Sequence, residues 1–226
     1  MWRGWNVPQS SEANPNDWEA AYLRFETPEE EVRKFIARLR KLGSDAWDRE
    51  AAVVELFCGR GNGLHALERL GFARVEGVDL SAALAAEYEG IGRVQVADCR
   101  KLPFADESKD IAIVQGGLHH LAELPGDLER TLAEARRVLR KGGRFVAVEP
   151  WLTPFLRGVH AMARSRLMRR MWERIDAMAT MIEHERRTYE QWLGQGAGIL
   201  RLLKGHFEEE ACRMEWGKLM FAGRKK

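Results

Sequence analysis

The chain has 226 residues, 45% of them hydrophobic and 31% charged, with a formal net charge of +2. This length suits one large domain, or one domain with a substantial insertion, and the composition is typical of a globular rather than a disordered protein. A protein that neutralises the phosphates of a long nucleic acid carries a larger basic excess, although a local basic patch is compatible with these numbers. DNA is therefore not an expected partner.

The three cysteines, Cys58, Cys99 and Cys212, cannot all pair with one another and show no CxxC spacing. This pattern predicts neither a disulfide framework nor a cysteine zinc site, and we expect no metal. The N-terminal residues lack the apolar run of a signal peptide, and no stretch of about 18 apolar residues could span a membrane. We therefore expect a soluble, cytoplasmic protein without a membrane partner.

Residues 1–50 are predicted to form an N-terminal arm and a helical cap. The first 17 residues are polar and contain two prolines, which is typical of a loose arm. A helical pattern follows, and Thr27-Pro28-Glu29 reads as an N-cap, a proline at the first helical position and an acidic first turn. Apolar residues then recur on one face of the helix, so this segment must pack on something.

Residues 51–150 alternate short apolar β runs with helical patterns. Several runs, such as Ile111–Val114 and Phe145–Val148, are apolar at nearly every position. Such runs are typical of parallel strands covered by helices on both faces. We predict a doubly wound, Rossmann-like α/β core, whose ligands bind beyond the carboxyl ends of the strands.

Residues 151–205 read as a helical insertion, and residues 206–226 return to β. A turn near Trp216-Gly217 predicts a terminal antiparallel hairpin, which completes a mostly parallel seven-stranded sheet. The insertion is interpreted either as a lid over the ligand site or as an interface, possibly of a homodimer. It carries a predicted apolar stripe on one helical face: Met168, Met171, Trp172, Ile175, Met178 and Ile182.

A glycine-rich turn joins the first predicted strand to the following helix. The turn contains Gly59, Gly61 and Gly63, and the strand before it ends near Glu55. A dinucleotide fingerprint, GxGxxG, would need its third glycine where Leu64 stands. The carboxylate of Glu55 suits a cationic amino-acid moiety rather than a pyrophosphate.

Polar side chains also stand at the ends of the next three strands. Asp79 can accept both hydroxyls of a ribose, or it can cap the helix that follows. Asp98 and the backbone of Cys99 can read an adenine edge, and Gln115 ends the fourth strand. We predict that these residues meet at one edge of the sheet.

The segments VVELFCGRGNG, VDLS, VADCRKLPFADESKDIAIVQGGLHHL and EARRVLRKGGRFVAVEP together resemble a known family. Their order and spacing are similar to those of class I S-adenosylmethionine-dependent methyltransferases, and most similar to the subgroup of ubiquinone, menaquinone and small-molecule methyltransferases. The resemblance implies S-adenosylmethionine as cofactor and S-adenosylhomocysteine as product. It also implies a role for each of the matching residues.

By this resemblance, Glu55, Gly59, Gly61 and Gln115 line the methionine end of the cofactor. The same resemblance implies that Asp79, with Leu80 beside it, binds the ribose. It also implies that Asp98 and Cys99 hold the adenine. One departure is that Phe57 stands where the usual pattern has a glycine. An aromatic residue also occurs there in some nucleic-acid methyltransferases.

His119 and His120 follow the fourth strand, where methyl transfer would occur. A neutral histidine could take a proton from a hydroxyl or amine as it attacks the methyl group, so both are candidate catalytic residues. Methyl transfer often needs only alignment in a desolvated pocket, so local packing is an equal alternative.

The sequence thus favours an enzyme that methylates O, N or C of a small molecule. An RNA or protein methyltransferase and a non-catalytic adenosyl-cofactor-binding protein remain the alternatives. The Asp/Asn-Pro-Pro-aromatic turn of amino-directed DNA enzymes and the Pro-Cys of cytosine-5 enzymes are absent after the fourth strand.

Overall fold

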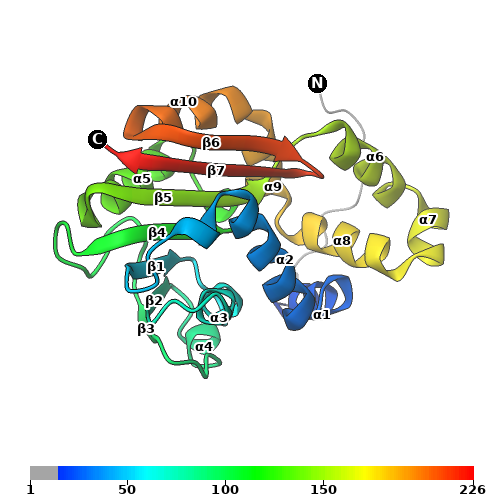
Figure 1. The fold of residues 1–226 in the computed structure, drawn as a ribbon. Coiled ribbons are helices and arrows are strands. Elements are labelled where there is room, and N and C mark those ends of the chain that lie inside the picture. Colours follow the sequence, from blue (N-terminus) through cyan, green and yellow to red (C-terminus); the bar gives the residue numbers. More distant parts are fainter. Residues whose placement is uncertain (1–14) are drawn as a thin grey trace.

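The structure is a computed structural model and describes residues 15–226. Its centre is a seven-stranded sheet in the order β3-β2-β1-β4-β5-β7-β6 (Figure 1). The strands are β1 (Ala52–Leu56), β2 (Arg74–Asp79), β3 (Arg93–Val96), β4 (Lys109–Gln115), β5 (Leu139–Pro150), β6 (Phe207–Glu215) and β7 (Lys218–Lys225). The first five pair in parallel, and β7 runs antiparallel to β5 and β6. The predicted sheet and its terminal hairpin are confirmed.

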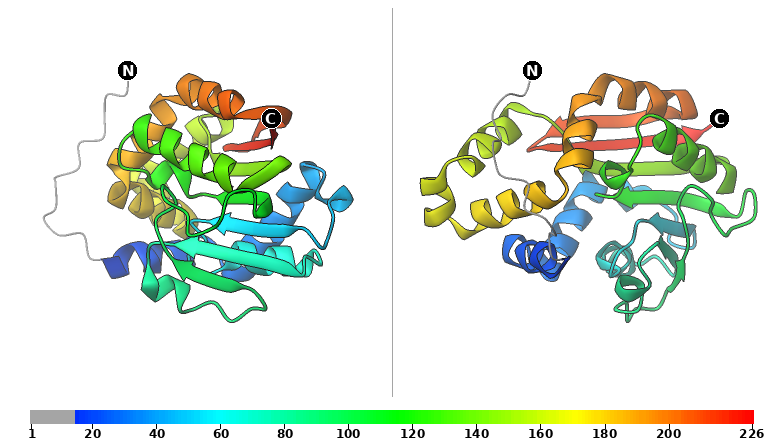
Figure 2. Two further views of the ribbon diagram at one scale, coloured as in Figure 1. Left: turned by 90° about the vertical axis from the view of Figure 1, so that its left-hand side faces the viewer. Right: turned by 180° about the vertical axis from the view of Figure 1, so that it is seen from behind.

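Helices cover both faces of this sheet (Figure 2). On one face, α2 (Pro28–Lys41) and α3 (Asn62–Arg69) bury Phe35, Leu39 and Leu67 against β1, β4 and β5. On the other face, α5 (Gly126–Val138) and α10 (Gly196–His206) bury Leu132 and Leu203. The short helix α4 (Ala82–Ala85) follows β2. Coverage of both faces explains why the central strands are almost entirely apolar.

The N-terminal helices α1 (Pro15–Phe25) and α2 form a cap beside the sheet (Figure 1). Thr27 and Glu30 make a capping box, because each side chain accepts the backbone N–H of the other residue at 3.2 Å. The predicted start of this helix is confirmed. The predicted loose arm falls mostly on residues 1–14, which lie outside the described residues.

The insertion forms four helices before α10: α6 (Pro154–Ala163), α7 (Arg166–Met171), α8 (Glu173–His184) and α9 (Arg186–Gly194). Helices α7 and α8 extend beyond the sheet on the same side as α1, and α1 packs on α8 (Figures 1 and 2). The prediction of one apolar stripe is wrong. Trp172 takes an extended conformation that ends α7, so Met171 and Trp172 are 59% and 49% exposed while Met178 and Ile182 are buried.

The terminal hairpin turns at Trp216 and Gly217, whose φ angles of 51° and 78° are both positive. Two positive φ angles are the mark of a type I′ turn, which matches the twist of the adjoining strands. The turn is tied to the start of the insertion, since Trp151 N–H donates to Gly217 O at 2.8 Å and Gly217 N–H to Thr153 Oγ1 at 3.1 Å. Among the described residues, no helix combines the length and the apolar character needed to cross a bilayer.

Candidate functional site

The glycine-rich turn brings the end of β1 against the first turn of α3. Gly59 and Gly61 have φ angles of 52° and 85°, which a side chain would disfavour. A Cβ atom at Gly63 would lie 1.7 Å from Glu55 Oε1, so the carboxylate occupies the space that the missing side chain leaves. The glycine at position 63 therefore has a local cause: the buried acid of β1 lies directly on the start of α3.

Glu55 is 2% exposed, and its Oε2 atom has no hydrogen-bond partner among the described residues. Burial raises the pKa of Glu55 well above its usual value, and the neighbouring charges of Glu31 and Asp79 raise it further, against a hydrogen bond from the Leu64 backbone. Three carboxylates, those of Glu31, Glu55 and Asp79, thus meet around one loop. Such an arrangement favours a ligand with positive charge at this position.

Glu31 is a site residue that sequence reasoning missed. It reaches over the loop from α2, where Oε2 accepts hydrogen bonds from Tyr22 Oη and from Asn62 Nδ2 at 2.6 Å. Its Oε1 accepts from Gln115 Nε2 at 2.9 Å. An acid in the first turn of a helix is fully explained by the helix dipole, so the sequence carried no sign of this second role.

Asp79 connects the tips of β1 and β2. Its Oδ2 accepts the Gly59 N–H and its Oδ1 accepts the Ser81 N–H, both at 2.8 Å. The alternative of Asp79 as the helix cap is wrong, because Ser81 Oγ caps α4 through Leu84 N–H. Each carboxylate oxygen retains a lone pair for a further donor, and Leu80 beside it is 63% exposed.

Asp98 and Cys99 follow β3, close to Asp79, since Ala97 N–H donates to Asp79 O at 2.9 Å. The Asp98 carboxylate accepts from Arg100 Nη2 at 2.7 Å and from Arg100 Nε at 3.0 Å, and these hydrogen bonds lower the pKa of Asp98. Cys99 is 3% exposed. The structure therefore places both residues at the predicted edge, with Asp98 held ionised by Arg100.

A second group of side chains lies beside this loop, where β4 leads through Gly116-Gly117 into a 3-10 turn, Leu118–His120. Glu149 at the end of β5 is fully buried. Its Oε1 accepts the N–H groups of Gly117 and Leu118 at 2.9 and 2.8 Å, and its Oε2 lies 2.8 Å from His119 Nδ1. With a carboxylate on Nδ1, we assign the proton to Nδ1 and the free lone pair to Nε2.

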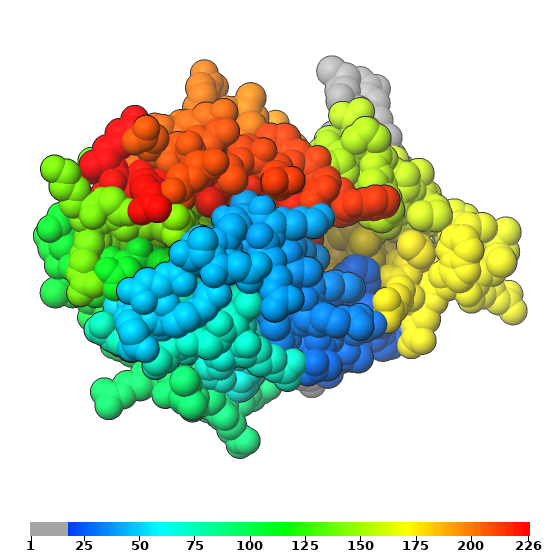
Figure 3. Space-filling model, in the orientation of Figure 1, coloured from blue at the N-terminus to red at the C-terminus, as the bar shows by residue number. Residues whose placement is uncertain are grey.

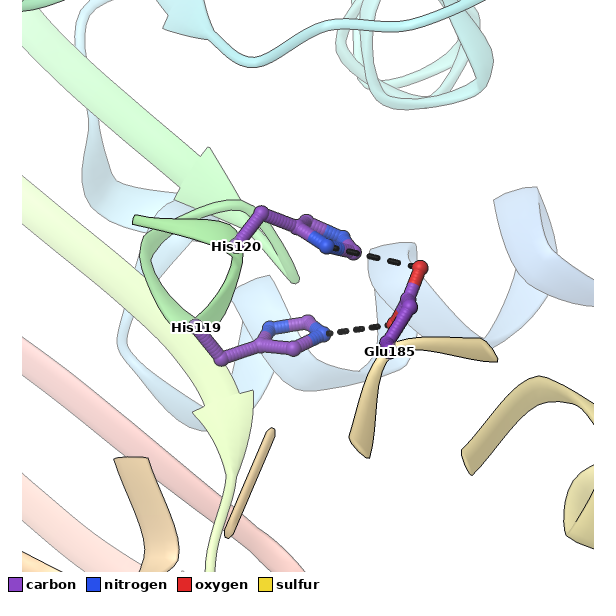
Figure 4. A group of neighbouring side chains, drawn as sticks. All are labelled: His119, His120 and Glu185. Atoms are coloured by element: carbon purple, nitrogen blue, oxygen red, sulfur yellow. Dashed lines mark ion pairs between the residues drawn. The ribbon is translucent and has the colours of Figure 1, made fainter. Parts of the chain in front are cut away.

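Glu185, between α8 and α9, faces both histidines (Figure 4). Glu185 Oε2 lies 3.9 Å from His119 Nε2, and Glu185 Oε1 lies 3.4 Å from His120 Nδ1. Burial lowers the pKa of His119 to about 3, helped by the charge of Lys218, so the ring is neutral at neutral pH. Burial also raises the pKa of Glu185 to about 7.

The candidate donor atoms of His119, His120 and Glu185 all lie within 4.8 Å of one another, so these side chains can also hold a metal ion. Sequence reasoning found the histidines but missed Glu149 and Glu185 as partners. Glu149 could have been found, because it ends a predicted strand at the ligand edge. Glu185 could not have been found, because nothing in the sequence distinguishes it from the other charged residues of the predicted helical insertion.

Phe57 joins the cofactor loop to the histidine turn. Its φ angle of 57° is unusual for a residue with a side chain and explains why a glycine is usual at this position. A Cβ atom at Gly117 would lie 2.4 Å from Phe57 Cβ, so the aromatic ring packs against bare backbone. The departure from the family pattern is therefore matched by a glycine on the neighbouring turn.

Comparison with known proteins agrees with this geometry. Residues 54–147 match the profile of a family described as "Methyltransferase domain". This match and the seven-stranded sheet support a class I S-adenosylmethionine-dependent methyltransferase. S-adenosylmethionine is the cofactor of this class, and its cationic ammonium and sulfonium groups fit an acidic loop at which Glu55 Oε2 has no hydrogen-bond partner among the described residues.

Among its relatives is the demethylmenaquinone methyltransferase of Symbiobacterium thermophilum, 30% identical over 108 residues that cover 43% of this chain and 41% of that protein. A solved structure, the PH0226 protein from Pyrococcus horikoshii, has a TM-score of 0.68 at 22% identity and covers 93% of this chain and 99% of that one. A Haloferax volcanii methyltransferase, solved in complex with the Trm112 methyltransferase activator, has a TM-score of 0.61 at 17% identity over 95% and 99% of the two chains. The curated relatives are matched over 19% to 52% of their own length.

Proposed function

We propose that the chain transfers the methyl group of S-adenosylmethionine to O, N or C of a small molecule. The observation that carries this proposal is the buried Oε2 of Glu55, which has no hydrogen-bond partner among the described residues, beside a glycine-rich loop. Phe57, which follows β1, packs on Gly117, in the turn that carries the two histidines. The carboxylate suits a cationic cofactor, and the histidines suit an acceptor that must lose a proton. Bound cofactor supplies an electrophilic methyl group on a sulfonium sulfur.

On the cofactor side, Glu31 and Glu55 would contact the positively charged end of the ligand. Hydrogen bonds from Asn62 and Gln115 hold Glu31 over the loop, and Glu55 lies against the same loop at Gly63. Asp79 would accept the ribose hydroxyls with its remaining lone pairs while it holds Gly59 and Ser81. Asp98 and Cys99 would flank the adenine. The matched set of Gly59, Gly61, Leu80 and Gln115 completes the proposed cofactor site.

On the acceptor side, we propose that His119 and His120 contact the attacking group. Glu149 holds the His119 ring by its Nδ1 atom at 2.8 Å, which leaves Nε2 directed toward Glu185 and the insertion. Helices α6 to α9 and the cap helices α1 and α2 would exclude water from this space, which strengthens every electrostatic interaction inside it.

The quinone methyltransferases among the relatives favour a ring-shaped acceptor, with C-methylation as one candidate. An RNA or protein acceptor is the main alternative. A non-catalytic cofactor-binding protein would bind the cofactor but methylate no acceptor.

We further propose a cytoplasmic location and a homodimer through the exposed residues Leu167, Met171 and Trp172.

Calorimetric titration of the purified chain with S-adenosylhomocysteine, with NAD as control, tests the proposal. We expect micromolar binding of S-adenosylhomocysteine and no binding of NAD, because a pyrophosphate would meet three carboxylates. Failure to bind S-adenosylhomocysteine would refute the proposed cofactor site. Light scattering of the same sample gives its mass, and a monomer would reject the homodimer.

A further inference from the structure

His119, His120 and Glu185 come from two parts of the chain that are far apart in sequence, yet their donor atoms converge (Figure 4). The separations of 3.9 Å and 3.4 Å from Glu185 to the two rings compare with roughly 3–4 Å between donors that surround one ion at about 2.1 Å. The widest separation, 4.8 Å, would need to shrink by only about 1 Å.

The surroundings of His119 add an independent observation. Histidines that bind metal almost always donate their other ring N–H to a carboxylate or carbonyl, which fixes the ring. His119 Nδ1 lies 2.8 Å from Glu149 Oε2, and Glu149 is itself held by the N–H groups of Gly117 and Leu118. The free Nε2 atom is therefore presented in a fixed direction, toward Glu185.

We propose that His119, His120 and Glu185 bind one divalent cation of the zinc type and leave further coordination positions open to a hydroxyl of the methyl acceptor. Two imidazoles and one carboxylate are a set of protein ligands that catalytic zinc uses, and zinc is redox-inert, as a methyl transfer requires. Our expectation of no metal was drawn from the cysteines and did not consider Glu185.

The role of this cation in catalysis rests on the proposed function, whereas its binding does not. Coordination lowers the pKa of a hydroxyl, as it does for water. The acceptor would lose that proton to solvent as it binds the cation, before the surrounding helices exclude water. Its oxygen would then form the new O–C bond while the methyl–sulfur bond breaks and leaves its electron pair on sulfur. The substrate class is then a hydroxyl compound, and the reaction is O-methylation.

The test uses the purified chain after EDTA treatment, titrated with Zn²⁺ by calorimetry and with Co²⁺ by visible absorption. We expect one ion per chain and cobalt bands typical of low-coordinate nitrogen and oxygen ligands. Glu185→Gln and His120→Ala should each weaken Zn²⁺ binding by about 10- to 100-fold or more. His184→Ala, which alters the neighbouring residue outside the cluster, should bind Zn²⁺ like the unmodified chain.

S-adenosylhomocysteine binding, measured on every variant, shows whether the fold is intact. No Zn²⁺ uptake by the unmodified chain, or equal uptake by Glu185→Gln, would overturn the metal site even if S-adenosylhomocysteine binds. Zinc uptake that depends on Glu185 in a chain that fails to bind S-adenosylhomocysteine would support the metal site and refute the proposed function instead.

Discussion

The polar side chains around the glycine-rich loop differ in how far the sequence alone could place them. Glu55, Asp79, Asp98 and Gln115 could be placed from the sequence, because each stands at the end of a strand and parallel strands end at one edge. Glu31 could not be placed in this way. Its position depends on how α2 packs across the sheet, and that packing joins residues 84 positions apart.

Replacing Glu31 by glutamine should weaken S-adenosylhomocysteine binding at least about tenfold, because a charge-assisted hydrogen bond contributes roughly 1.5–3 kcal/mol. The ligand 5′-methylthioadenosine lacks the amino-acid end, so its binding should change little. Calorimetry with both ligands measures the difference. Glu29→Gln is the matched control, since Glu29 lies in the same helical turn but pairs outward with Arg69. Equal losses for both ligands would contradict contact of Glu31 with the amino-acid end.

At the scale of elements, the sequence correctly predicted the helix start and the hairpin turn, because a few adjacent residues determine each of these structures. The capping box at Thr27 and the turn at Trp216-Gly217 follow from the preferences of a few adjacent residues. The apolar stripe in the insertion failed because the chain turns at Trp172, and no glycine or proline marks that break. Periodicity alone cannot separate two short helices from one long helix.

Thr27→Ala should lower the free energy of unfolding by about 1 kcal/mol, because the first turn of α2 loses its side-chain cap. Urea unfolding, followed by circular dichroism, measures this change. Ser108→Ala is a suitable control, since the exposed Ser108 hydroxyl bonds only to a nearby loop carbonyl, Ala105 O. An unchanged midpoint for Thr27→Ala would show that tertiary packing alone fixes the start of α2.

At the scale of the whole molecule, the sequence predicts the class of sheet, which is mostly parallel and doubly wound. It does not predict where the helices of the insertion lie around the site. Long apolar runs specify parallel strands under two helical layers. The approach of α8 and α9 to the histidine turn depends on contacts between segments more than 60 residues apart, such as Glu185 with His119. The space-filling view shows the blue cap helices against the core and the yellow part of the insertion, which includes α7 and α8, projecting beyond it (Figure 3).

Acid should destabilise the fold in part through Asp127, which joins α5 to the loop after β3. Burial raises the pKa of Asp127, but hydrogen bonds from Arg130 and Arg100 outweigh it and the pKa is lowered. This contribution is complete above the unfolded pKa of about 3.9 and is lost as the pH falls through the folded pKa. Urea unfolding should therefore show Asp127→Asn to be less stable at pH 6, with a smaller gap at pH 3. A constant gap would contradict this assignment.

The position of β7 has a consequence for aggregation. Residues 218–225 lie between β5 and β6 and pair with β5 from Arg144 to Pro150. Because β5 is apolar at nearly every position from Phe145 to Val148, detachment of the hairpin would leave an apolar, unpaired strand edge open to other chains. Partial unfolding that begins at the hairpin should therefore make the protein prone to aggregation and proteolysis.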